Sequence, residues 1–84
     1  MPGGVNYIEV RKIVYECIKQ IGVSYEELYI TPISNGFKVE LSPTPRINEL
    51  EEVSKCISAK TKLDTCVKEY PYGNIIVART RKTT

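Results

Sequence analysis

Residues 28–41, LYITPISNGFKVEL, contain the pattern that decides the fold. From Gly36 to Leu41, apolar and charged side chains alternate, which is the period of a β-strand with one buried face. The residues from Leu28 to Thr31 predict a shorter strand before it. Asn35-Gly36, within the intervening segment ISNG, is typical of a tight hairpin turn in which positive φ angles are needed. We therefore expect an antiparallel β-hairpin in the middle of the chain.

An amphipathic helix is predicted ahead of this hairpin, from Asn6 to Ile21. Its apolar side chains recur at helical spacing and form one stripe, while most of its charged side chains lie on the other side. Gly22 follows the last apolar residue and is a candidate to end the helix. The stripe consists of Ile8, Val10, Ile13, Val14, Cys17, Ile18 and Ile21.

A second helix and a second hairpin are predicted after the first hairpin. Thr44 has the chemistry of a helix N-cap, and Pro45 suits the first turn of the helix that follows. Segments 63–70 and 74–80 both have the composition of strands, and residues 71–74, PYGN, predict the turn between them. The apolar stripe of the second helix consists of Ile47, Leu50, Val53, Cys56 and Ile57.

The predicted order is αββαββ, which indicates an α+β two-layer sandwich with both helices on one face of a four-stranded, mostly antiparallel sheet. Strands 37–41 and 75–80 are expected in the centre, where a right-handed crossover through the second helix would make them parallel neighbours. This arrangement resembles a circular permutation of the ferredoxin-like plait. The resemblance is one of topology and implies no chemistry.

Residues 6–80 are expected to form one domain, with residues 1–5 as a flexible lead and residues 81–84 as a basic tail. The halves 6–42 and 44–80 match at several positions when they are offset by 39 residues, as Cys17 and Cys56 do. This predicts an internal αββ duplication.

Strand parity leaves one face of the predicted sheet uncovered by helices. That face would be aromatic, basic and apolar, which suits the binding of another molecule. The side chains assigned to it are Tyr29, Lys38, Glu40, Lys68, Tyr70, Ile76, Ala78 and Thr80.

Catalysis, cofactors and metals find no support in the sequence. The chain has no histidine, the commonest general base, and no nucleophile has a base at a recognisable spacing, so it is not expected to be an enzyme. Its five glycines form no phosphate-binding run, and its three cysteines form no Cys-x-x-Cys pair.

The three cysteines, Cys17, Cys56 and Cys66, are interpreted as small buried apolar side chains in a reducing cytosol. A disulfide between two of them, with the third left free, is the alternative. No apolar run approaches the roughly 18 residues of a membrane span, and no secretory signal is recognisable, so a cytoplasmic location is expected.

The predicted function is binding. The net charge of +2 is too mild to require a nucleic-acid partner, but the chain becomes strongly basic after residue 78. Nucleic-acid binding is the favoured hypothesis, with DNA and RNA both open. The alternative is self-association or binding of another protein through the same sheet face, which would bury Ile76, Ala78 and the tyrosines. The residues proposed to contact nucleic acid are Tyr29, Lys38, Lys68, Tyr70, Arg79, Arg81 and Lys82.

Overall fold

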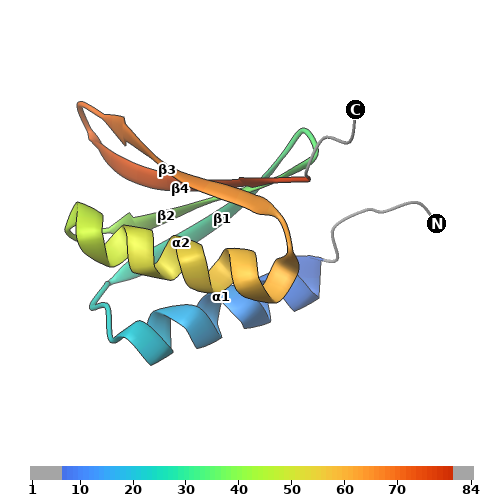
Figure 1. The fold of residues 1–84 in the computed structure, drawn as a ribbon. Helices are drawn as coiled ribbons and strands as arrows, with labels where there is room; N and C mark the ends of the chain where they lie inside the picture. The colour runs from blue at the N-terminus through green and yellow to red at the C-terminus, as the bar shows by residue number, and fades with distance from the viewer. Residues whose placement is uncertain (1–6, 81–84) are drawn as a thin grey trace.

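The computed structural model describes residues 7–80 and contains the predicted elements in the predicted order (Figure 1). Both helices lie on the same side of the sheet, so the α+β two-layer sandwich is confirmed. Residues 1–6 and 81–84 lie outside the described part of the chain, and the expectations for the lead and the basic tail stay predictions. The elements are α1 Tyr7–Ile21, β1 Glu27–Ile33, β2 Gly36–Ser42, α2 Ile47–Thr61, β3 Asp64–Tyr70 and β4 Gly73–Arg79.

The sheet has the strand order β1-β2-β4-β3, and all neighbouring strands are antiparallel. The predicted adjacency of the two central strands is therefore confirmed, but their predicted parallel direction is wrong. The crossover through α2 joins β2 to β3, which run parallel with one strand position between them. The second hairpin then reverses the chain and places β4 in that position. The result is the strand arrangement of a permuted ferredoxin-like plait.

The C-terminus of α1 and the N-terminus of α2 are capped in different ways. Gly22 ends α1 as predicted, with a φ of +87° and its N–H donating to the carbonyl of Ile18 at 2.9 Å. The N-cap of α2 is Arg46, two residues later than the predicted Thr44. The carboxylate of Glu49 accepts a hydrogen bond from the Arg46 N–H at 3.2 Å and so caps the helix where it begins.

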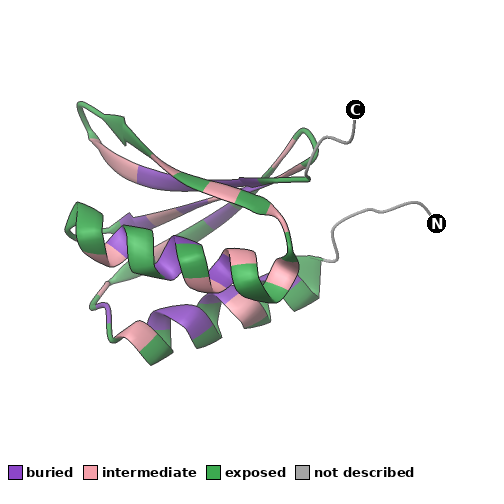
Figure 2. Ribbon diagram, in the orientation of Figure 1, coloured by how far each residue is buried: buried purple, intermediate pink, exposed green. Residues whose placement is uncertain are grey.

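The core lies between the helices and one face of the sheet (Figure 2). From the sheet, Phe37, Val39 and Leu41 of β2 enter the core as their alternation predicted, and Ile76 and Ala78 of β4 join them, each fully buried. From the helices the core receives Val10, Val14, Cys17, Ile18, Leu50, Val53 and Ile57.

Ile76 and Ala78 were predicted to lie on the uncovered face, and that prediction is wrong. Residues 75–78 are apolar at every position, so this segment has no alternation from which a face can be read. The pairing of Phe37 with Ala78 decides it, because directly paired residues point to the same side of a sheet. Ile75 and Val77 consequently take the positions on the uncovered face.

A disulfide joins Cys17 of α1 to Cys56 of α2, with their Cα atoms 5.7 Å apart, and Cys66 is free and exposed on β3. The interpretation of all three cysteines as buried thiols is therefore wrong, and the alternative of one disulfide with one free cysteine is correct. The two bonded cysteines lie where the two helices pack against each other. Their spacing along the chain does not show that they come together there. In the described part of the chain, neither helix is long and apolar enough to cross a membrane.

Candidate nucleic-acid interface

The face of the sheet opposite the helices is not covered by any element of the described chain, and we call it the open face (Figure 1). The strand register places residues in rows across this face. One row contains Thr31, Lys38, Val77 and Cys66. The next row, nearer the C-terminal end of β4, contains Gly36, Arg79 and Asp64. By the same parity the predicted residues Tyr29, Glu40, Lys68 and Tyr70 also belong to this face.

A groove of about 560 Å³ lies at one end of the open face, where β4 ends. Lys68 and Arg79 both line it, together with Val77 and Cys66, which are paired across β3 and β4. Asn35, from the turn between β1 and β2, completes this end of the groove. Two of the cations predicted from sequence thus line one groove, with the row of Val77 and Cys66 between them.

Tyrosines gather at the other end of the open face. Tyr29 of β1 is 50% exposed, and the rings of Tyr70 and Tyr72 are stacked with their centroids 5.1 Å apart. A small hollow of about 170 Å³ is lined by Tyr29 and Tyr72, with the buried Ile75 as another of its walls. Exposed aromatic rings beside a hollow offer flat surfaces for stacking.

Sequence reasoning missed Tyr72, which is 74% exposed. It lies in the two-residue turn between β3 and β4, outside the strands, where alternation of side chains indicates no face. A tyrosine directly after Pro71 was the available signal, since a side chain in a two-residue turn has little of its own chain to pack against.

Charges on the open face are balanced in number but not in position. Lys38, Lys68 and Arg79 are its described cations, and Glu27, Glu40 and Asp64 are its described anions. Arg79 lies opposite Asp64 at the groove end, and Glu27 lies beside the tyrosines. The predicted contacts Arg81 and Lys82 lie outside the described residues.

The hydroxyl of Tyr29 donates a hydrogen bond to Glu27 Oε1 at 2.7 Å. This bond, followed by the negative charges of Glu27 and Glu40, raises the pKa of Tyr29 above its usual value of 10.0. The Tyr29 hydroxyl, already protonated at neutral pH, therefore stays protonated to a higher pH than that of an ordinary tyrosine.

The apolar centre of the open face is largely covered by its own neighbours. Ile75 and Val77 are each only 6% exposed although no helix lies over them. Within residues 7–80, no three side chains of the metal-binding types lie close enough together to hold an ion. The accessible groups on this face are therefore mainly tyrosine rings, lysine and arginine side chains, and carboxylates.

A scan against models of known protein families finds no match to this chain. A search of curated proteins likewise finds none of significant similarity.

Proposed function

We propose that this protein binds single-stranded nucleic acid across its open face, without catalysing a reaction. The observation that carries the proposal is the groove that Lys68 and Arg79 both line, on the same face as the exposed ring of Tyr29. Phosphates would contact the two cations while bases stack on the tyrosines. Proteins that bind single strands without sequence preference combine these two kinds of contact. A single strand fits better than a duplex, because the open face presents a sheet and no helix that could enter the major groove of a duplex.

The charge pattern supports modest, salt-sensitive binding. Asp64 and Glu40 reduce the positive potential of the described face, so the affinity depends on where the cations lie more than on their number. Lys38, in the central row, would bridge the groove and the tyrosines. Arg81 and Lys82, just beyond Arg79, are proposed to add phosphate contacts, and a cytoplasmic location remains part of the proposal.

Self-association through the open face is less favoured. That alternative required a bare apolar centre formed by Ile76 and Ala78, but both are in the core, and their neighbours Ile75 and Val77 are already almost covered. Apart from the tyrosine rings, little apolar area is left on this face to drive association.

The test is fluorescence anisotropy with labelled 12-nucleotide single strands of DNA and RNA and a matching duplex, at low salt. The variant Lys68→Ala with Arg79→Ala should bind the single strands at least about tenfold more weakly, a loss of ~1.4 kcal/mol. The matched control is Lys12→Ala with Lys19→Ala, which removes the same charge from exposed positions of α1.

A second variant, Tyr29→Ala with Tyr72→Ala, tests the stacking surface without changing the charge. It should weaken single-strand binding by about tenfold, because base stacking on an aromatic ring contributes roughly 1–3 kcal/mol per base. Equal losses in the α1 control and the groove variant would show that only net charge matters, and no binding by the unmodified protein would refute the proposal.

A further inference from the structure

The two outer strands of the sheet differ in how their free edges are protected. On β1, the hydroxyl of Tyr7 donates a hydrogen bond of 2.7 Å to the carbonyl of Ile30. Pro32 on the same strand has no N–H to offer a partner. Both are devices that keep another strand from pairing with an edge.

On β3, the main-chain groups at the free edge have no such protection. A two-residue turn connects Tyr70 to Gly73, so these two residues are hydrogen-bonded to each other, and so are the alternate pairs along the hairpin, among them Cys66 with Val77. The N–H and C=O groups of Thr65, Val67 and Glu69 therefore point away from β4. Within residues 7–80, no hydrogen bond to these outward groups is found.

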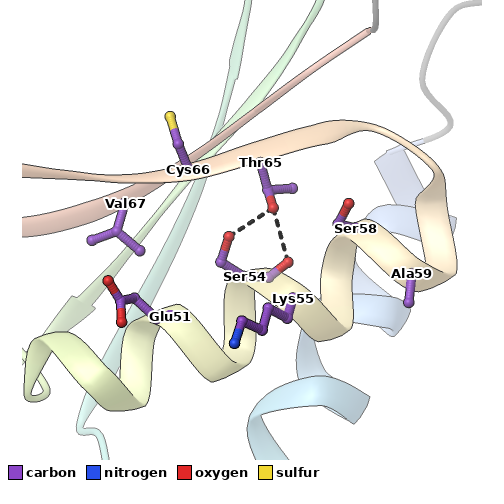
Figure 3. Close-up of a pocket in the computed structure, with 8 residues that line it drawn as sticks. All are labelled: Glu51, Ser54, Lys55, Ser58, Ala59, Thr65, Cys66 and Val67. Atoms are coloured by element: carbon purple, nitrogen blue, oxygen red, sulfur yellow. Dashed lines mark hydrogen bonds between the residues drawn. The ribbon is translucent and has the colours of Figure 1, made fainter.

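The space beside this edge is open. A groove of about 680 Å³ runs between β3 and α2, and small side chains from the helix, including Ser54, Ser58 and Ala59, line it (Figure 3). Figure 3 shows Thr65 pointing to the helix, where its hydroxyl donates to the Ser54 carbonyl at 2.9 Å, and Cys66 pointing the opposite way, to the open face. The helix thus leaves the β3 edge accessible along its length.

We propose that a second copy of this protein pairs with β3 along this edge, antiparallel, with Cys66 of one copy opposite Cys66 of the other. The partner is a second copy because the sequence of the strand, DTCVKEY, is complementary to itself in that register. Asp64 of each copy then lies opposite Lys68 of the other, on the open face. Cross-strand pairs of opposite charge stabilise antiparallel strands.

Only this register satisfies both the hydrogen bonds and the charges. Outward-pointing residues must pair with outward-pointing residues, and pairing Thr65 with Val67 of the other copy meets that requirement. Centring the pairing on Thr65 would place Asp64 opposite Cys66 and give no pair of opposite charges, and centring it on Lys68 would bring two lysines together. Centring it on Val67 gives no pair of opposite charges.

In the proposed register, the two Cys66 residues form a pair without mutual hydrogen bonds, whose Cα atoms are about 4.5 Å apart. That separation is within the range of about 4.4–6.8 Å that a disulfide spans. Two open faces would join into one continuous eight-stranded surface, with the grooves of both copies next to the symmetry axis. This inference concerns the edge of the sheet and does not depend on nucleic-acid binding.

The first test is cross-linking of the full chain with diamide, which accepts the two electrons and two protons released when two thiols form a disulfide. The unmodified protein has one free thiol, Cys66, and should give a covalent dimer with a Cys66–Cys66 peptide detectable by mass spectrometry. The matched control, Cys66→Ser with Thr31→Cys, presents an exposed thiol on the same face at the protected β1 edge. It should cross-link at least about tenfold more slowly, the expected contrast between paired and unpaired edges.

The second test needs no thiol and uses Cys66→Ser as its background in sedimentation equilibrium, with circular dichroism to verify folding. Asp64→Lys should weaken dimerisation by about tenfold because each cross-strand attraction becomes a repulsion. Adding Lys68→Asp should restore it, since the two charges are exchanged.

A monomer at every concentration, equal cross-linking of the Thr31→Cys control, or no recovery in the exchanged variant would each overturn the proposal. The outcome is separable from the nucleic-acid test, because Asp64→Lys adds positive charge to the groove and should strengthen nucleic-acid binding while weakening the dimer.

Discussion

Gly36 is the residue that lets the two hairpins approach each other. A Cβ atom added at this position would collide with the carbonyl group of Ala78 on β4, which is main chain and cannot rotate away. The sequence pattern suggested a different role, in which Asn35 and Gly36 both adopt positive φ. Only Asn35 does, with a φ of +65°. Glycine is needed here for close contact between strands, which is a tertiary requirement.

We expect Gly36→Ala to lower the free energy of unfolding by about 2–4 kcal/mol, since the central strands must separate to admit one methyl group. Gly22→Ala is the matched control. Gly22 has a φ of +87° and no atom within 4 Å of an added Cβ, so its substitution costs only backbone strain, about 1 kcal/mol. Urea unfolding of both variants measures the difference, and equal losses would argue against the close contact.

Tyr29 should titrate at higher pH than an unperturbed tyrosine, because its pKa is raised by the hydrogen bond to Glu27 and by nearby carboxylates. A raised pKa in the folded state means that this bond contributes stability below pH 10 and that the contribution is lost as pH rises through the folded-state value. Carbon-13 NMR of the tyrosine rings resolves the individual titrations. Glu27→Gln should lower the pKa of Tyr29, whereas Glu69→Gln, on the far outer strand, should leave it where it is.

At the level of elements, what could be predicted followed from the contrast between neighbouring side chains. In β2 the alternation of Phe37, Lys38 and Val39 identified both the strand and its buried face. The strand β4 was also predicted, but its buried and uncovered faces were exchanged. Ile75 and Ile76 are equally apolar, so no alternation shows which of them is buried. The same holds for the candidate site. Its strand lysines and tyrosines were assigned to the correct face of the sheet, whereas the residues of its apolar centre were not.

The Cys17–Cys56 disulfide should contribute substantially to stability, because it joins two helices 39 residues apart in the chain. A loop of that size reduces the entropy of the unfolded chain by an amount equivalent to about 4 kcal/mol. We expect Cys17→Ala with Cys56→Ala to lose about that much in guanidinium unfolding, while Cys66→Ala changes little. A loss in the Cys66 variant as large as in the double variant would contradict this assignment.

α2 and β3 are held together by a pair of hydroxyl groups, those of Ser54 and Thr65, whose oxygens are 2.6 Å apart. Ser54 is buried, so Thr65→Val leaves the Ser54 hydroxyl without this partner. The substitution should lower the free energy of unfolding by about 1–3 kcal/mol. Replacing both, with Ser54→Ala added, should recover part of that loss. A double-mutant cycle from thermal unfolding measures the coupling, which should be close to zero if the bond is unimportant.

For the whole molecule, the order of elements and the two layers followed from local patterns, and the direction of the central strands did not. Local periodicity specifies which segments are strands, whereas the direction in which β4 enters the sheet depends on where the crossover places β3. The internal duplication stays a prediction. Lys38 and Val77, which face each other across the central pair, are 39 positions apart, as are the two bonded cysteines.

Salt dependence is a property of the whole charge distribution. If Lys38, Lys68 and Arg79 are the principal phosphate contacts, the logarithm of the affinity for a single strand should fall with the logarithm of salt concentration with a slope of about −2. Contacts from Arg81 and Lys82 would make the slope steeper by about 0.7 each. A flat dependence between 50 and 200 mM, concentrations at which phosphate contacts change affinity by about tenfold or more, would contradict the assignment.

The helix-to-helix disulfide also has a consequence for cleavage of the chain. Cys17 and Cys56 lie on opposite sides of the largely exposed connection at residues 43–46, which joins the first hairpin to the second helix. A protease nick there would sever the backbone but leave two fragments attached through sulfur, each still donating strands to the same sheet. Such a nicked protein would migrate as one species until a reducing agent separated its halves.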